Sequence, residues 1–326
     1  MKVFVAGATG ALGRRLVPML VRGGHEVTAL TRTPAKVELV RQLGARPVVA
    51  DALDPDAVAR AVAEAEPDGV IHELTALADA LRSRNLDKAF AVTNRLRTEG
   101  TDHLLAAARA VGARRFIAQS FAGWPFERTG GPIKTEEDPL EHSPPPTVAQ
   151  TLGAIRHLEE SVTSAKGIEG LALRYGGFYG PGTSLATAPD GEHVALVRRR
   201  MLPIIGGGAG IWSLIHIEDA AAATLAALHR GEPGVYNVVD DEPAPVRIVL
   251  EELARVLGAK PPRRIPRWLG RLVAGEGMTI MMTEVRGASN VKAKRELGME
   301  LRYPSWRLGF RAGLGPAAEP QPAIAR

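Results

Sequence analysis

The chain has 326 residues, of which 45% are hydrophobic and 24% are charged, which is enough apolar material for one large α/β domain and a smaller one. It contains no cysteine, and this excludes disulfides, thiolate metal ligands and a cysteine nucleophile. We see neither a secretion signal nor a run of about eighteen apolar residues, so we expect a cytoplasmic protein with no membrane partner.

The charge balance is basic, with a formal net charge of +5 and a pI of about 9.7. Arginines cluster at 198–200 and 263–267, but no aromatic residues are interleaved with them as in proteins that stack single-stranded bases. We therefore expect solvated basic faces and no nucleic-acid partner. An anionic small-molecule substrate stays compatible with this charge.

The first thirteen residues indicate a strand, a glycine turn and the start of a helix. An apolar run at 3–6 leads into Gly7, Gly10 and Gly13, and apolar residues at helical spacing follow. Glycines at these positions permit a tight turn, a close approach to a pyrophosphate and close helix packing, and the helix N-terminus attracts an anion. The alternative is a tight turn that binds nothing. The residues predicted to bind a dinucleotide here are Gly7, Thr9, Gly10, Ala11, Leu12 and Gly13.

A second strand at 27–30 and a helix at 34–43 follow. The residue type just after this strand indicates whether NAD or NADP is bound. No acidic residue lies between Glu26 and Glu38, whereas Arg32 stands at the strand end. An acid at this place holds the 2′-hydroxyl of NAD, and an arginine accommodates the 2′-phosphate of NADP. The sequence favours NADP, and the alternative is an ordinary surface arginine.

The third and fourth strands are expected at 48–53 and 70–72. In an open parallel sheet, ligands bind outside the carboxyl ends of the strands. Asp51, Ala52, Leu74 and Thr75 are therefore predicted to contact adenine and ribose. His72 ends a buried strand and is expected to be structural.

The elements then alternate, with a helix at 98–111, a strand at 115–120, a helix at 148–165 and a strand at 171–175. Strands that alternate with helices predict a parallel sheet with right-handed crossovers, a doubly wound Rossmann-type α/β fold. The segment 123–146, rich in Gly, Pro and charge, is interpreted as a loop over the active site. The glycines of 176–182 are expected to prevent regular structure.

Four segments resemble the NAD-dependent epimerase/dehydratase group, the extended and atypical short-chain dehydrogenases/reductases. Residues 173–182 resemble its "LR…YGPG" segment, 212–221 its "FVHVDDVA" segment, 235–238 its "YNV" strand and 289–298 its closing helix. The resemblance implies an NADP-binding domain from 1–175 and 211–242, a substrate domain from 176–210 and 243–312, and a frayed tail at 313–326. It also makes residues 198–200 and Trp268 candidates for a substrate cleft, with surface roles as the alternative.

The family's catalytic pair, Tyr-x-x-x-Lys on one helix, is missing. None of the four tyrosines is followed by Lys four residues later, and alignment on Glu159 puts Thr151 and Ile155 at those positions. Ser120 stands in or next to the family's catalytic serine position, with Phe121 as the alternative. Tyr175 is next to the expected nicotinamide position. We therefore predict Ser120 and Tyr175 as catalytic residues that also contact the cofactor.

Three functions remain open. The first is an NADP-dependent oxidoreductase that acts on a small-molecule carbonyl or alcohol with another hydroxyl as the acid. The second is NADP binding without turnover, in a structural or redox-sensing protein. The third is an isomerase or lyase of the same family. No signature of a nucleophilic hydrolase or metal enzyme occurs, and a homodimer is compatible with this fold.

Overall fold

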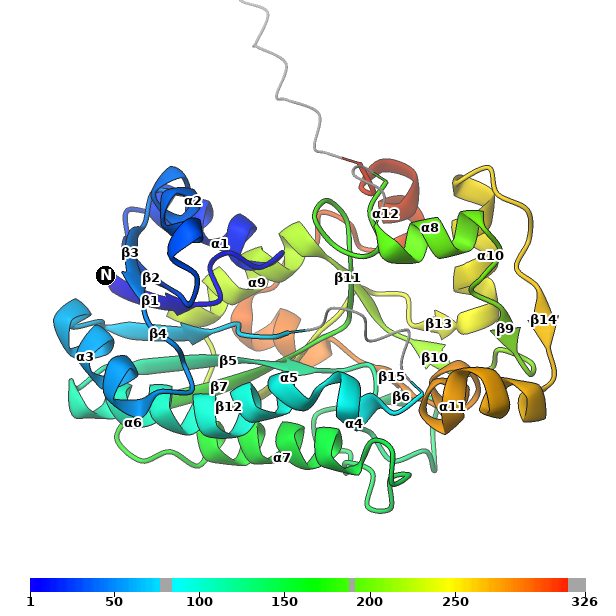
Figure 1. Cartoon of the computed structure of the whole chain (residues 1–326), viewed down its shortest axis with the longest axis horizontal. Coiled ribbons are helices and arrows are strands. Elements are labelled where there is room, and N and C mark those ends of the chain that lie inside the picture. Colours follow the sequence, from blue (N-terminus) through cyan, green and yellow to red (C-terminus); the bar gives the residue numbers. More distant parts are fainter. Residues whose placement is uncertain (77–83, 188–190, 316–326) are drawn as a thin grey trace, which may run out of the picture.

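The computed structural model describes residues 1–76, 84–187 and 191–315. Seven strands form one sheet in the order β12-β7-β5-β4-β1-β2-β3, and every neighbouring pair is parallel. The predicted doubly wound parallel sheet is thus confirmed (Figure 1). Its strands are β1 (Lys2–Ala6), β2 (Glu26–Thr31), β3 (Arg46–Val49), β4 (Gly69–His72), β5 (Arg115–Phe121), β7 (Glu169–Tyr175) and β12 (Gly234–Val238).

Two layers of helices cover the sheet because successive strand side chains point to opposite faces. In β1, Val3 and Val5 pack with α1 and α9, whereas Phe4 and Ala6 pack with α3 and α6. Figure 1 shows α1 and α9 on one side of the sheet and α3, α6 and α7 on the other. These helices are α1 (Gly13–Arg22), α2 (Val37–Gln42), α3 (Pro55–Ala65), α6 (Thr101–Ala110), α7 (Ala149–Thr163) and α9 (Ile217–His229).

Two of the expected elements have different bounds. The third strand ends at Val49, so Asp51 lies in the turn beyond it rather than in the strand. The helix expected at 98–111 is the last part of a longer run, which comprises α4 (Leu86–Ala89), α5 (Ala91–Arg95), a π-helical turn (Leu96–Gly100) and α6. We call residues 96–100 the π-turn.

The second part of the chain builds small two-stranded sheets around separate apolar clusters. The expectation that 176–182 has no regular structure is wrong. β8 (Gly177–Tyr179) pairs in parallel with β11 (Leu214–His216), because positive φ is confined to Gly180 and Gly182. The other elements are β6 (Ile133–Lys134), α8 (Glu192–Arg198), β9 (Ile204–Ile205), β10 (Ile211–Trp212), β13 (Ala244–Pro245), α10 (Val246–Val256), β14 (Arg264–Ile265), α11 (Arg267–Thr283), β15 (Gly287–Ala288) and α12 (Trp306–Ala312).

The start of the expected tail is packed. Leu314 is buried, and the carbonyl of Gly313 lies 3.0 Å from Nε2 of His216. The remaining residues of the predicted tail, 316–326, lie outside the described residues. The division into two domains stays a prediction.

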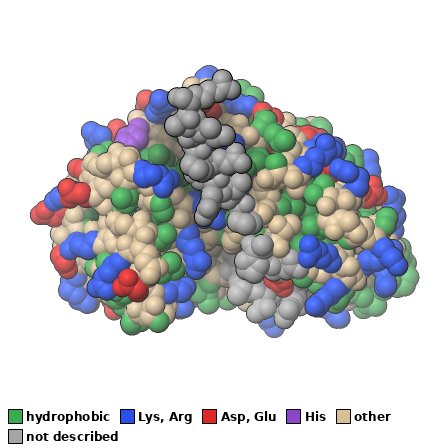
Figure 2. All heavy atoms as spheres, turned by 90° about the horizontal axis from the view of Figure 1, so that it is seen from above, with side chains coloured by type: hydrophobic (Ala, Val, Ile, Leu, Met, Phe, Trp, Pro, Cys, Tyr) green, Lys and Arg blue, Asp and Glu red, His purple; other side chains and the backbone are tan. Residues whose placement is uncertain are grey.

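On the face shown in Figure 2, lysine and arginine side chains are spread over both halves of the molecule rather than gathered in one field. No helix of the described residues is long and apolar enough to cross a membrane. The cytoplasmic location, the homodimer and the lack of a nucleic-acid partner stay predictions.

Candidate functional site

The glycine turn between β1 and α1 is shaped by close backbone contacts. Gly7 has a φ of +109°, and a Cβ there would lie 2.6 Å from the carbonyl oxygen of Glu73. A Cβ on Gly13 would lie 2.3 Å from the carbonyl oxygen of Gly7. No side chain caps α1 and no acid occupies its first turn, so the positive end of the helix dipole is open to an anion.

A cavity of about 490 Å³ extends from this turn across the carboxyl ends of the central strands. It is walled by the loop after β4, the π-turn, the ends of β5 and β7, and α7, with apolar residues from the second part of the chain at its far end. Of the predicted binding residues, it is lined by Gly7, Gly10, Ala11, Leu12, Gly13, Thr75 and Tyr175.

The other predicted cofactor residues lie outside the cavity wall. Arg32 directly follows β2 and is exposed, and within the described residues no carboxylate pairs with it. The Asp51 carboxylate accepts the N–H of Leu53 at 3.0 Å, and Ala52 is buried. Thr9 and Leu74 are partly buried. All five follow the carboxyl ends of β1 to β4, where the sequence placed them.

Ser120 lies on the face of the sheet that packs against α7. Its hydroxyl donates to Oε1 of Glu159 at 2.6 Å, and Glu159 also accepts two hydrogen bonds from Arg174, each of 2.7 Å. The neighbouring Gln119 and Phe121 line the cavity, whereas Ser120 does not. The structure thus does not bring the Ser120 hydroxyl to the cavity, and its catalytic role stays a prediction.

Tyr175 lines the cavity, but its hydroxyl is engaged inside the protein. It is hydrogen-bonded to Oε1 of Glu73 (3.1 Å) and to Oγ1 of Thr224 (2.6 Å). Burial, followed by the nearby Glu73 carboxyl, raises the pKa of Tyr175 well above its usual value, which makes it a weak proton donor. Its catalytic role also stays a prediction.

Glu73 is a residue that the sequence analysis missed. It is buried and lines the cavity, and its Oε2 has no hydrogen-bond partner among the described residues. Burial raises the pKa of this carboxyl to about 8, against the smaller opposite effect of the hydrogen bond from Tyr175. Glu73 is therefore mostly protonated at neutral pH.

Thr151 and Ile155 face the cavity from one side of α7, as their spacing of four residues requires. The Thr151 hydroxyl donates to Oδ1 of Asp87 at 2.7 Å and accepts from Nδ2 of Asn94 at 3.2 Å. Its hydrogen is thus already used, and Ile155 carries neither charge nor donor. α7 therefore presents no free acid and no cation to the cavity through these two positions.

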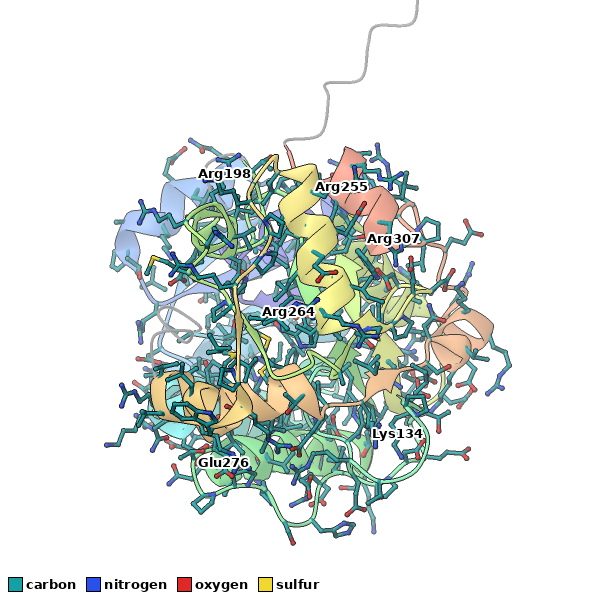
Figure 3. All side chains as sticks on the ribbon, turned by 90° about the vertical axis from the view of Figure 1, so that its right-hand side faces the viewer. Lys134, Arg198, Arg255, Arg264, Glu276 and Arg307 are labelled. Atoms are coloured by element: carbon teal, nitrogen blue, oxygen red, sulfur yellow. The ribbon has the colours of Figure 1, made fainter. Side chains whose placement is uncertain are left out.

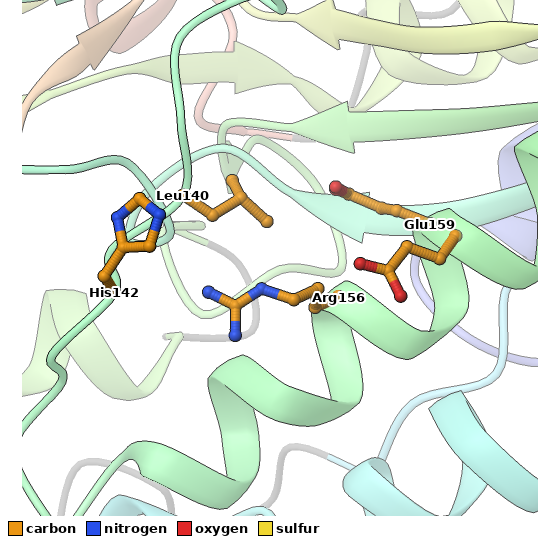
Figure 4. Close-up of a pocket in the computed structure, with 5 residues that line it drawn as sticks. Leu140, His142, Arg156 and Glu159 are labelled. Carbon is orange, nitrogen blue, oxygen red and sulfur yellow. The ribbon is translucent and has the colours of Figure 1, made fainter.

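Arg156, the next residue on α7, points away from the cavity. It extends toward the loop that carries His142 (Figure 4) and donates to the carbonyl of Glu141 at 3.0 Å. It lines a separate, open pocket on the outer side of α7. Arg156 therefore cannot supply a positive charge to the cavity in place of the lysine that was expected at position 155.

The far end of the cavity is apolar and was not predicted. Three methionines of α11, at positions 278, 281 and 282, line it. Their spacing on one side of a helix was the only sign of this apolar wall in the sequence. The main lining residues here are Trp124, Trp212, Leu250, Leu253, Met278, Met281 and Met282.

The basic residues suggested for a substrate cleft lie elsewhere. Trp268 is 68% exposed, and neither it nor residues 198–200 line the cavity. Figure 3 shows this end of the molecule, where Arg255 and Arg264 form exposed ion pairs with Glu252 (2.6 Å) and Glu251 (2.7 Å). These residues belong to the solvated surface.

The profile of the NAD dependent epimerase/dehydratase family matches residues 3–238. The chain belongs to this family. The match contains the glycine turn, all seven strands of the sheet and the cavity-facing side of α7. It confirms the resemblance predicted from the sequence.

Individual proteins agree with this membership. The 3-diazoavenalumate denitrifying reductase of a Streptomyces species is 46% identical over 311 residues, which cover 95% of this chain and 99% of the relative. The UDP-glucose 4-epimerase of Thermus thermophilus, solved with NAD, is 25% identical with a TM-score of 0.71 and coverages of 96% and 98%. A human epimerase family protein solved with NADPH is 19% identical with a TM-score of 0.72 and coverages of 95% and 98%.

The residues of this chain fit a nicotinamide dinucleotide. Side chains at Gly7 and Gly13 would collide with the backbone that shapes the turn, and no side chain caps the start of α1. The glycine turn would hold the pyrophosphate. We call the glycine turn and the start of α1 the cradle. The family and the cradle together indicate a nicotinamide-binding protein of the oxidoreductase or epimerase class.

Proposed function

We propose that the protein is an NADPH-dependent reductase that replaces the diazonium group of a small molecule by hydrogen. One observation carries the proposal. Among the described residues that line the cavity, Tyr175 is the only tyrosine, and its hydroxyl is held by Glu73 and Thr224. The cavity therefore suits a reduction that needs a hydride and no proton.

Carbonyl reduction consumes a hydride and a proton, so it needs an acid beside the substrate. Reduction of a diazonium carbon consumes only the hydride. When bound, NADPH supplies this hydride, whose electron pair forms the new C–H bond while dinitrogen leaves with the electron pair of the C–N bond. Such a reaction therefore needs neither the tyrosine nor the lysine that α7 lacks.

The chain's own residues have three tasks in this proposal. The glycine turn binds the pyrophosphate, and Arg32 binds the 2′-phosphate that distinguishes NADPH from NADH. The apolar far end of the cavity binds the body of the substrate and excludes water, which would otherwise compete with hydride for a diazonium carbon. The 46% identical relative supports this assignment, since its name specifies a diazo substrate, a reduction and the loss of nitrogen.

The test is anaerobic incubation with deuterium-labelled NADPH and a ¹⁵N-labelled aryl diazonium salt. We expect ¹⁵N-dinitrogen by mass spectrometry and deuterium on the carbon that carried nitrogen. The control is the Gly13→Val protein, because it corrects for direct reaction between the two reagents. Dinitrogen release at the same rate in both proteins, or a product without deuterium, contradicts the proposal.

Glu73 supports a second candidate function, carbonyl reduction. Its buried carboxyl lines the cavity and keeps its proton at neutral pH, so it is the group there best suited to act as an acid. Glu73→Gln discriminates the two functions. Reduction of a diazonium should continue in this variant, whereas reduction of a carbonyl should be lost. Tight NADPH binding without turnover of either class would favour the sensor.

A further inference from the structure

The π-turn carries a buried cation, the guanidinium of Arg97. Arg97 is 6% exposed and lines the cavity together with Gln119, Thr151 and Ile155. Among the described residues it makes no hydrogen bond or ion pair, and its Nε is buried without a partner. A buried guanidinium without a partner is costly, so its persistence points to a ligand.

The charge of Arg97 is not cancelled locally. The carboxylate of Glu159 influences it, but Glu159 is already bound by Arg174 through two hydrogen bonds. Burial lowers the pKa of Arg97 only to about 10, with Glu159 acting in the opposite direction. The guanidinium therefore stays protonated at neutral pH, and Arg97 is the only Lys or Arg among the described lining residues.

The fold holds Arg97 in place through its neighbour. Leu74 N–H donates to Nδ1 of His72 at 3.3 Å, so Nε2 carries the proton and donates to the carbonyl of Leu96 at 3.1 Å. This contact ties the π-turn to the end of β4. Turns of this type within a helix frequently occur at functional sites.

The ligand of Arg97 is not a cofactor phosphate. The pyrophosphate cradle lies at α1, on the face of the sheet that α1 shares with α9. The π-turn packs with α6 and α7 on the opposite face. Arg32, the residue placed for a 2′-phosphate, follows β2, which is two strands away from β4 in the sheet.

We infer that Arg97 binds a carboxylate of the substrate, whose apolar body occupies the cavity lined by Trp124, Trp212 and the α11 methionines. The planar guanidinium pairs with a carboxylate through two parallel hydrogen bonds. The substrate class is thus an apolar carboxylic acid. This rests on the proposed function only in that the substrate occupies this cavity.

The test is calorimetric binding of cinnamate, a flat aryl carboxylate, and of cinnamamide, its uncharged counterpart, to the full-length protein without cofactor. Wild type should prefer cinnamate by about tenfold or more. Arg97→Gln should remove this preference and leave cinnamamide binding unchanged. Arg156→Gln is the matched control, because Arg156 points to the outer side of α7 and does not line the cavity. The Arg156→Gln protein should bind both probes as wild type does.

Equal binding of the two probes by wild type, or no binding of cinnamate, overturns the inference even if Arg97→Gln fails to fold. An Arg97→Gln protein that loses NADPH affinity by the same factor as cinnamate affinity also overturns it, since the guanidinium would then belong to the cofactor cradle. The assay needs no turnover. Its failure leaves the diazo proposal standing, and absence of dinitrogen release leaves the carboxylate site standing.

Discussion

The two ends of the cavity are built in different ways. The glycine-turn end is made by the backbone of one continuous segment, and its shape depends on the absence of side chains at Gly7, Gly10 and Gly13. The α7 end is made by side chains from four separate segments, Glu73, Arg97, Thr151 and Tyr175. The first end is formed by backbone atoms, and the second is formed by polar and titratable side chains.

This difference separates binding from chemistry. A backbone cradle accepts any nucleotide of the right shape and leaves the reaction open, because it offers N–H groups but no titratable group. The side chains of the other end decide which group is charged and which proton can move. The titratable groups at the α7 end include a buried Glu73, whose pKa is raised to about 8, and a buried Arg97.

The largest effect is expected at the glycine turn. Gly13→Val should weaken NADPH binding by more than about 100-fold, because its Cβ would lie within 2.3 Å of the Gly7 carbonyl. Fluorescence titration with NADPH measures this. The matched control is Gly153→Ala in α7, where a Cβ meets nothing within 4 Å. Tight NADPH binding by Gly13→Val would contradict the assignment of the glycine turn as the nucleotide site.

The next effect concerns the α7 end and depends on pH. The Glu73 pKa is raised in the fold to about 8 from 4.5, so between these values the native state holds a proton that the unfolded state has lost. The free energy of unfolding must then fall as pH rises through this window. In Glu73→Gln, the loss of stability between pH 5 and pH 8 should shrink by at least about 2 kcal/mol.

Urea unfolding at both pH values measures the change. Glu300→Gln, which alters an exposed carboxyl, is the control. A Glu73→Gln protein with the same pH slope as wild type would show that Glu73 is ionised in the fold. Carbonyl reduction by its acid form would then be excluded.

A smaller effect is expected at the edge of the glycine-turn end. Arg32→Ala should weaken NADPH binding by about tenfold or more and NADH binding by less than about twofold, since only NADPH carries a 2′-phosphate. Parallel titrations with the two nucleotides measure this. Equal losses would mean that Arg32 is an ordinary surface arginine.

The sequence was sufficient for the glycine-turn end because its signal is local. The turn, the two strands β1 and β2 and the residue after β2 lie within about 30 consecutive positions, and each has a direct conformational meaning. The π-turn and β8 were not predicted, because helical pattern does not distinguish a π-turn and glycines at 176–177 adopt extended backbone in contact with β11.

The α7 end could not be assembled from the sequence because its residues meet only in the fold. Nothing near Glu73 indicates that its carboxyl contacts Tyr175, about a hundred residues later. Burial is what raises the Glu73 pKa and leaves Arg97 unpaired, and burial is a property of the packed structure. The loss of Tyr and Lys from α7 was visible, but their replacements were not.

Ser120 shows where a signal was present but unused, and it gives the smallest expected effect. Along β5, Phe116 and Ala118 pack toward α7, and the alternation of strand side chains puts Ser120 on that same face. Its hydroxyl donates to Glu159 there. Ser120→Ala should therefore keep NADPH-dependent turnover within about twofold while costing about 1 kcal/mol of stability.

Steady-state rates and thermal unfolding of Ser120→Ala, with Thr163→Ala as a control for loss of a hydroxyl outside the cavity, measure both quantities. A folded Ser120→Ala protein that loses its activity would restore the serine to catalysis. It would also remove the contrast between the two ends, because the α7 end would then retain one of the family's catalytic groups. Retained activity means that the reaction does not need the Ser120 hydroxyl, as expected for transfer of a hydride alone.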